Sequence, residues 1–531
     1  MFILITNRSH QVINHDFNYK YYILLIFSIG CLVRGIPELI AYPYPIGSDG
    51  INYYIPAVTF FDSQWRTILH QFPVYVFLLH LINIFSGLNP YHTVIAVATG
   101  VFGIFAVSLF FVGQKILKLT AMESTFLSLF VIFQIAVLRA SLDLHRDMLA
   151  LTILLLTYVL IYKSNQSNVS FQTIAIAMAF SAIIVSTDGM IGALFILSLI
   201  IYSFIAKTKI VILCTIVAIA FFTATILPTE NNFHRILYLH MTHQTETGRT
   251  YSEYYMEPEQ VFYEPISLVI SFFLLNALLI PTGVLGLSKA MTKEDKPLLL
   301  TLPLLICFLL SLSWILFPKN ITLVADRWIM LFGIFLSIFA AYGIVRLIMR
   351  AKRTSAYKRI IISSSILGMF IIIGMVYATR PADQSFNLLD ATNPYTRSLA
   401  LGTMQPDKES NDKLINAISW INNNTAENST IVGGKNMRGY MQLKLDAERK
   451  WNDFGLREDN AERYFELFDN FLVDHEKEKD NFIADPENTY VVTSKTHFLN
   501  YTSDNLKYMK VYSGELNIFK LLFIDKMREW K

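Results

Sequence analysis

The stretch YYILLIFSIGCLVRGIPELIAYPYPIGSDGINYY, residues 21–54, combines a long apolar run with a polar turn directly after it. A helix needs about 20 largely apolar residues to cross a membrane, and residues 21–42 supply them. Arg34 and Glu38 interrupt the run and no small-residue cleavage site follows it, so it does not have the pattern of a cleaved signal peptide. We therefore expect the chain to cross a membrane here and to leave it just before the turn.

Comparable apolar runs recur along the chain and predict about eleven crossings in all. The later runs lie at 92–113, 121–139, 148–162, 171–187, 190–206, 210–228, 266–287, 297–318, 329–349 and 360–379. Of the 531 residues, 53% are hydrophobic and only 16% are charged, whereas soluble proteins carry about 25% charged residues. The sequence thus predicts an α-helical polytopic membrane protein.

Charge and cysteine content exclude other classes. The net charge of +3 is too small to hold a nucleic acid by counterion release. The three cysteines, Cys31, Cys214 and Cys307, lie inside apolar runs and are too scattered for a disulfide framework or a zinc cluster. We interpret them as small buried hydrophobic residues.

The segment 73–89 decides the sidedness of every later loop. It is short, contains His80 and Asn83, and ends in Gly-Leu-Asn-Pro, which predicts an interfacial helix instead of a span. With this segment lying flat, the Lys and Arg residues gather in alternate loops, as the positive-inside rule requires. The N-terminus is then cytoplasmic, and the outer segments are 43–91, 140–147, 229–265, 319–328 and the tail.

The tail, residues 381–531, differs abruptly from the rest because it is rich in Asp, Glu, Asn and Lys. Its patterns predict helices over 409–424 and 459–472 and strands over 429–432, 489–494, 509–513 and 516–522. This is enough chain for one small α/β domain. We expect a transmembrane domain over 1–380 and an extracytoplasmic α/β domain over 381–531.

Three short polar motifs lie on the predicted outer side. Asp49 stands between a serine and a glycine, which is a good turn sequence, but a carboxylate at the membrane boundary can also act as a general base. Asp143 and Asp147 are four residues apart and would share one helix face, although acids also favour solvated helix starts. Arg327 opens a span beside Trp328; its planar fork suits phosphate oxygens, or the pair could anchor the helix at the interface.

The order and common sidedness of these motifs resemble the GT-C superfamily of integral-membrane glycosyltransferases, over about residues 20–380. Members such as dolichyl-phosphate-mannose protein mannosyltransferases and oligosaccharyltransferases take a sugar from a polyprenyl-linked donor. The resemblance implies that Asp49 is the essential first-loop aspartate and that Asp147 is the acid at the entry to the fourth span. It further implies that Arg327 binds the donor phosphate, and we add Arg146 as a second phosphate ligand.

The tail also resembles the outer domains of archaeal-type and oligosaccharyltransferase-like members, with one departure. The Trp-Trp-Asp-Tyr-Gly signature expected after the strand at 429–432 is replaced by Gly433-Gly-Lys-Asn-Met-Arg-Gly-Tyr440. This difference argues against recognition of Asn-x-Ser/Thr acceptors and favours transfer of a single sugar or an unidentified acceptor.

Other polar residues have secondary interpretations. His240 and His243 in the loop 229–265 could bind a metal with a carboxylate, but a substrate-gating loop is the favoured interpretation. Asp188 is expected to form a tight turn, with lining of the cavity as the alternative. Arg34, His145 and His234 could assist phosphate binding.

The function predicted from these residues is inverting sugar transfer from a polyprenyl-phosphate donor at the outer membrane face. Asp49 would deprotonate the acceptor, Arg327 and Arg146 would bind the donor phosphate, and Asp147 with Asp143 would position the acceptor or hold Mg or Mn. The expected location is the plasma membrane, or the endoplasmic reticulum in a eukaryote. A transporter or flippase of lipid-linked substrates, and a scaffold without activity, are the alternatives.

Overall fold

The computed structural model describes seventeen stretches of the chain, and the structural statements below concern these stretches. They are residues 15–47, 49–61, 73–164, 170–206, 208–226, 269–270, 272–292, 296–313, 325–349, 355–380, 406, 408–433, 437–446, 449–453, 489–493, 506–513 and 516–523.

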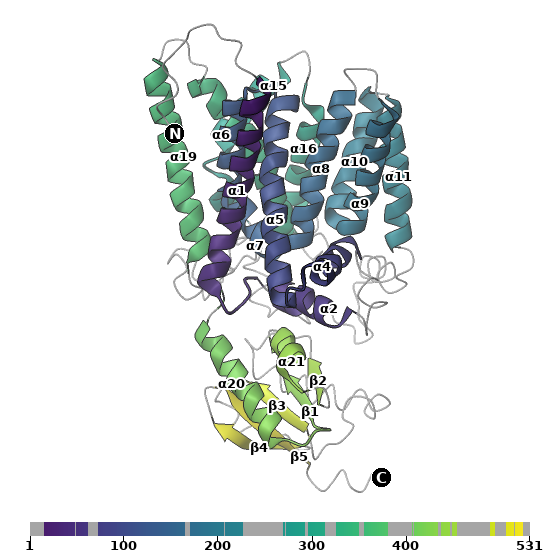
Figure 1. Ribbon diagram of the computed structural model, residues 1–531, viewed down its shortest axis with the longest axis vertical. Coiled ribbons are helices and arrows are strands. Elements are labelled where there is room, and N and C mark those ends of the chain that lie inside the picture. Colours follow the sequence, from purple (N-terminus) through teal and green to yellow (C-terminus); the bar gives the residue numbers. More distant parts are fainter. Residues whose placement is uncertain are drawn as a thin grey trace.

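A helical bundle occupies most of the molecule, and a smaller part built around a sheet lies at one end of it (Figure 1). We call this end the tail end. The bundle helices that the argument uses are α1 (His15–Ala41), η2 (Gly50–Tyr54), α2 (Ile55–Thr59), α4 (Pro73–Ser86), α5 (Pro90–Phe111), α6 (Ala121–Ile132), α7 (Ile135–Asp143), α8 (His145–Ser164), α9 (Phe171–Thr187), α10 (Gly189–Ala206), α11 (Lys209–Ile226), α15 (Ile280–Met291), α16 (Leu298–Ser311), α18 (Ala325–Ile344) and α19 (Ala356–Thr379).

Six of the described helices are long and apolar enough to cross a membrane, and the bent pair α6–α7 makes a seventh if it is one span. The two helices of this pair meet at 64°. The predicted polytopic helical class is therefore confirmed, whereas the count of eleven stays a prediction. The single span predicted over 266–287 is wrong in detail, because a turn at 277–279 interrupts it and α15 continues to Met291.

Helix α4 accounts for most of the ambiguous segment 73–89. It lies at the tail end, and α5 begins at that same end and runs back alongside α1 (Figure 1). Asn89 caps the start of α5, where its side chain accepts a hydrogen bond from the backbone N–H of His92. The segment therefore does not cross the bundle, which agrees with the prediction from its sequence.

Helix α18 is the most deeply enclosed of the candidate spans, with its whole apolar window buried. It packs against α15 and α16. Gly286 and Gly343 allow the close approach to α15, because a Cβ atom at either position would overlap a backbone carbonyl oxygen of the other helix. This packing fixes the position of α18, which carries Arg327 in its first turn.

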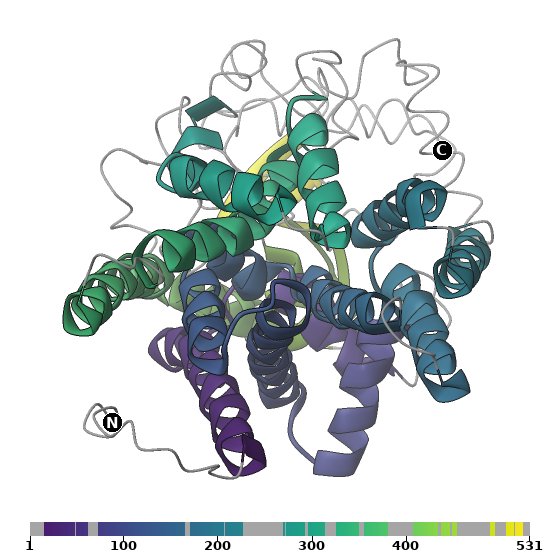
Figure 2. The same cartoon turned by 90° about the horizontal axis from the view of Figure 1, so that it is seen from above.

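The tail contains a five-stranded sheet in the order β2-β1-β3-β5-β4, and it lies beneath the bundle in Figure 2. Strands β2, β1 and β3 are parallel, whereas β5 is antiparallel to both β3 and β4. The elements are α20 (Lys408–Asn424), β1 (Thr430–Gly433), α21 (Arg438–Lys444), β2 (Lys450–Asp453), β3 (Thr489–Thr493), β4 (Leu506–Ser513) and β5 (Asn517–Phe523).

Helix α20 packs on this sheet with a single apolar face. Leu414, Ala417, Ile418 and Ile421 recur at helical spacing and are buried. The predicted helix 409–424 and the four predicted strands are confirmed within a few residues. Helix α21 and strand β2 were not predicted, and the expected helix 459–472 lies outside the described residues.

Candidate active site

Asp49 lies at the tail end of the bundle, where the chain turns from α1 into the short helix η2. Its backbone N–H donates a hydrogen bond of 3.1 Å to Oδ1 of Asp143. Asp49 is the residue before the first turn of η2, yet its side chain makes no capping hydrogen bond to that helix among the described residues. The backbone of Asp49 is thus held against the end of α7, and the residue is partly buried.

Gly47 allows this close approach. Its φ of +78° belongs to the left-handed region, which L-residues with a Cβ atom avoid. A Cβ atom here would lie 2.5 Å from the carbonyl oxygen of Leu142 and 2.8 Å from Oδ1 of Asp143. Gly47 therefore brings the loop against the end of α7.

We expect Gly47→Ala to move this loop away from α7 and to break the hydrogen bond from the backbone N–H of Asp49 to Oδ1 of Asp143. The backbone amide of Asp49 would then exchange its hydrogen about tenfold faster. Gly87→Ala is the matched control, because Gly87 also has a positive φ, +64°, but has nothing within 4 Å of a Cβ position. It should lose about 1–2 kcal/mol for the left-handed backbone and leave the exchange of Asp49 unchanged. Equal exchange in both variants would contradict the role given to Gly47.

The break between α7 and α8 divides the second predicted motif. Asp143 ends α7 and His145 begins α8, so the expectation that Asp143 and Asp147 share one helix face is wrong. Nor do they belong to a solvated helix start, since their exposed fractions are 5% and 3%. Asp143 is paired with Arg139 at 3.1 Å and accepts from Asp49, and therefore positions the loop.

Asp147 faces a different set of partners. Its carboxyl group is hydrogen bonded to that of Asp188, and it interacts electrostatically with Arg146 and Arg327. Asp188 also forms the tight turn predicted for it, because Oδ1 accepts from the backbone N–H groups of Met190 and Ile191, each at 2.9 Å. Turn formation was the favoured expectation for Asp188 and lining of the cavity the alternative; the structure shows the turn and also brings Asp188 against Asp147.

Arg327 interacts electrostatically with acidic residues of two separate segments. Its charge acts on both Asp49 and Asp147, which come from segments far apart in the sequence. Trp328 is buried at 8% exposure, so it packs within the protein instead of anchoring the helix in lipid. The structure thus brings Asp49, Asp143, Arg146, Asp147 and Arg327 into one cluster.

Asp49 has an unusual electrostatic environment. Burial and the neighbouring charge of Asp143 raise the pKa of Asp49 from 3.8 to about 6, against the opposing influence of three arginines. A carboxylate with a pKa near neutrality is a better proton acceptor than an ordinary aspartate and is still ionised at pH 7.

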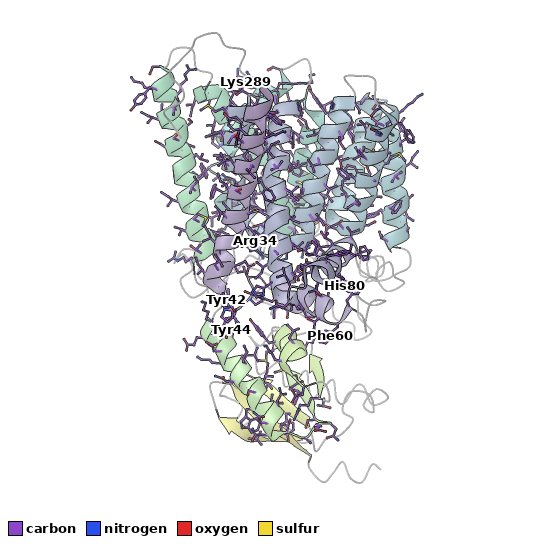
Figure 3. All side chains as sticks on the ribbon, in the orientation of Figure 1. Arg34, Tyr42, Tyr44, Phe60, His80 and Lys289 are labelled. Carbon is purple, nitrogen blue, oxygen red and sulfur yellow. The ribbon has the colours of Figure 1, made fainter. Side chains whose placement is uncertain are left out.

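A buried ion pair on α1 contacts the two segments that carry Asp49 and Asp143. Arg34 Nη2 lies 2.6 Å from Glu38 Oε1, and Arg34 Nε donates to the carbonyl oxygen of Ser141 at 2.9 Å. Glu38 Oε2 accepts from the backbone N–H of Ile46 at 3.4 Å. Figure 3 shows Arg34 inside the bundle toward the tail end. The Arg34–Glu38 pair thus links α1 to α7 and to the segment 42–49, which we call the Asp49 loop.

His145 completes this support. Its Nε2 lies 3.3 Å from Arg34 Nη2, and its ring stacks on Tyr54 with centroids 5.1 Å apart. Arg34 and His145 were expected to assist phosphate binding, and their described contacts are with protein groups. Glu38 and Arg139 were missed, although charged pairs four residues apart within apolar runs were the available signal.

Some predicted residues lie outside the described part of the chain. These are His234, His240 and His243 with the whole loop 229–265, and the side chain of Asp326. Among the described residues, no three His, Cys, Asp or Glu side chains gather as a metal site. Asp147 has one acidic partner and two arginine charges nearby, which is a poor donor set for Mg or Mn. The divalent cation stays a prediction.

Three solved structures have the same fold over most of this chain. ArnT from Cupriavidus metallidurans in the apo state aligns with a TM-score of 0.56 and 13% identity, covering 94% of this chain and 98% of that one. The same protein bound to undecaprenyl phosphate gives 0.54 and 12%, with coverage of 94% and 98%. Arabinofuranosyltransferase AftD from Mycobacteria gives 0.50 and 11%, covering 95% of this chain and 40% of that one.

No protein-family model and no curated protein sequence matches the chain. The chain nevertheless shares its fold with ArnT and AftD.

Proposed function

We propose that this chain, which has the GT-C fold, transfers a sugar from a polyprenyl-phosphate-linked donor to an acceptor at the tail end of its bundle. The observation that carries the proposal is the pairing of Asp49 with Arg327. One is a carboxylate with a pKa near 6, the other a permanent cation, and they influence each other inside one cluster. A base and an anion-binding group within one cluster suit displacement of a phosphate leaving group.

The neighbouring structures support the donor class. ArnT is seen with undecaprenyl phosphate bound, and AftD is titled an arabinofuranosyltransferase. We therefore infer a polyprenyl chain on the donor of this protein as well. The acceptor is identified only by its chemistry, as a group with a removable proton.

The proposed reaction is a single displacement. Asp49 takes the proton from the acceptor hydroxyl or amide as the acceptor atom bonds to the anomeric carbon of the sugar. The bond between that carbon and the phosphate oxygen breaks on the opposite face, which inverts the configuration. The phosphate leaves with the bonding electrons, and Arg327 and Arg146 stabilise its charge. Asp147, held by Asp188, would position the acceptor.

We further propose that the tail end faces the outer side of the plasma membrane, or the lumen in a eukaryote. The basic loops support this orientation by the positive-inside rule. Lys289, which belongs to one of those loops, lies at the end opposite the tail (Figure 3). The domain boundary near residue 380 is part of the same proposal.

The described charges favour transfer over transport. Transporters place their binding groups near the middle of the membrane, often in broken helices. Here Arg34, Glu38, Arg139, Asp143 and Asp147 lie toward the tail end of α1 and at the α7–α8 break. The same buried cluster, with the raised pKa of Asp49, also supports an active protein over a scaffold without activity.

The raised pKa of Asp49 predicts the pH dependence of the reaction. Because the base must be ionised, kcat/KM should fall about tenfold per pH unit below pH 6. In Asp143→Asn the repulsion that raises this pKa is removed, while the amide oxygen can still accept from Asp49. The acid limb of the pH–rate profile should therefore move to lower pH. An unchanged limb in this variant would show that another group titrates.

Purified protein tests the proposal directly. Labelled polyprenyl-phosphate sugars of several kinds are supplied with membrane extract as the acceptor, and transfer of label is measured. Transfer from at least one donor supports the proposal. Uptake of the intact donor into proteoliposomes without transfer of its sugar would instead favour the transporter.

A further inference from the structure

The Asp49 loop lies between two parts of the molecule. One face rests on α7 through Gly47 and the bond from Asp49 to Asp143. The other face meets the tail, where Tyr42 and Tyr44 mark the boundary in Figure 3. The segment that carries the proposed base is therefore fixed from both sides.

The tail contacts begin before Asp49. The Tyr44 hydroxyl donates to Asp412 of α20, and the Tyr44 ring meets that of Tyr440 edge-on at 6.1 Å. Lys408 Nζ donates to the backbone carbonyl oxygen of Tyr42 at 3.1 Å. These contacts tie the start of the loop to α20 and α21.

The contacts continue on η2, directly after Asp49. The backbone N–H of Gly439 donates to Asn52 Oδ1 at 3.0 Å. Ile51 packs both with the bundle core and with the apolar cluster of the tail. At Gly439 a Cβ atom would overlap the carbonyl oxygen of Ile51, so only glycine allows α21 to reach η2 this closely.

We propose that Asn52 and Gly439 are positioning residues through which the tail holds Asp49 in place for the reaction. The role of Asp49 in this statement rests on the proposed function. The tail is then a part of the catalytic arrangement in addition to covering it, because α21 packs on η2 directly after Asp49. A displacement of about 1 Å at a base can cost about 100-fold in rate.

Two variants of the full-length protein test this. Gly439→Ala introduces the overlap with Ile51, and Asn52→Ala removes the hydrogen-bond acceptor without adding bulk. Gly368→Ala is the matched control, since Gly368 is also helical and a Cβ atom there meets nothing within 4 Å. Hydrogen exchange of the Ile46 and Asp49 amides is measured together with kcat and the donor KM.

We expect exchange at these two amides to rise about tenfold in Gly439→Ala, with a smaller rise in Asn52→Ala. The kcat should fall about 100-fold in Gly439→Ala, while the donor KM stays within about twofold. Gly368→Ala should change none of these quantities. A general loss of folding would instead raise exchange throughout α18 as well.

The failures of the two proposals are distinguishable. If exchange at Ile46 and Asp49 is unchanged in both variants, or rises equally throughout α18, the tail does not position the loop and the inference is overturned. If exchange rises locally but wild-type protein transfers no sugar from any donor, the contact between tail and loop stands and the proposed function fails. A local rise without loss of kcat overturns the positioning role.

Discussion

Asp49→Asn is expected to lower kcat by about 100- to 10,000-fold, the range that a general base contributes. The amide keeps the size of the side chain and cannot accept the proton of the acceptor. Binding of the donor should be unaffected, because Arg327 and Arg146 remain. The variant should show the defect in kcat with little change in the donor KM, measured by transfer of labelled sugar.

The same variant should be no less stable than the wild type. Folding raises the pKa of Asp49 from 3.8 to about 6, so the native state binds the proton more tightly than the unfolded state does. Its contribution to stability is greatest below pH 3.8 and is lost as the pH rises through 6. At pH 7 the wild-type carboxylate is ionised in a partly buried site, which lowers the free energy of unfolding. The neutral amide of Asp49→Asn avoids this cost, so the variant should unfold at an equal or higher temperature.

Glu409→Gln is the control for the change from acid to amide. Glu409 lies on the first turn of α20, is largely exposed and pairs with Lys413 on the surface. It should keep wild-type kcat and unfolding temperature. Full activity of folded Asp49→Asn would remove Asp49 from the base position.

Arg327→Gln is expected to lower kcat by about 100- to 1,000-fold, as the loss of one group that stabilises developing charge does. The glutamine cannot compensate the charge that the phosphate gains as its bond to the sugar breaks. Arg327→Lys should recover part of the rate, because it restores the charge without the planar fork. Initial rates with one labelled donor across the three proteins provide the measurement.

The two arginine variants should also differ in their pH profiles. The charge of Arg327 lowers the pKa of Asp49, so removing it should move the acid limb to higher pH, and Arg327→Lys should largely reverse that shift. Arg346→Gln is the control, because Arg346 lies near the other end of the same span and its Nε donates a hydrogen bond to the Tyr342 hydroxyl. A rate loss in Arg327→Gln with an unchanged acid limb would separate Arg327 from Asp49.

The sequence predicted the parts of this account that depend on local pattern. Apolar runs located the six helices that the structure describes as long and apolar enough to span a membrane. The short segment 73–89 was recognised as an element that does not cross the bundle. Asp49, Asp147 and Arg327 were selected because they lie at the predicted outer ends of spans and because their order and common sidedness resemble a known superfamily. Their gathering into one cluster is a tertiary result that the structure supplied.

Local pattern failed where a backbone break or a long-range contact decides the structure. The sequence around Leu144 contains no proline or glycine, so its pattern allowed Asp143 and Asp147 to share one helix, whereas the structure has a break at Leu144 between α7 and α8. Gly47 packs against Leu142 and Asp143, which are remote from it in sequence. The bond between Asn52 and Gly439 joins positions 387 residues apart, and no local pattern encodes it.

The central claim is that this protein transfers a sugar from a polyprenyl-phosphate donor by means of Asp49. The most direct measurement follows release of free polyprenyl phosphate from labelled donor by purified wild-type protein and by Asp49→Asn, each with the acceptor extract present. The account predicts release that matches the sugar transferred by the wild type, and a rate lower by at least about 100-fold in the variant. Equal release by the two proteins, or transfer of sugar without release of the lipid phosphate, would contradict it.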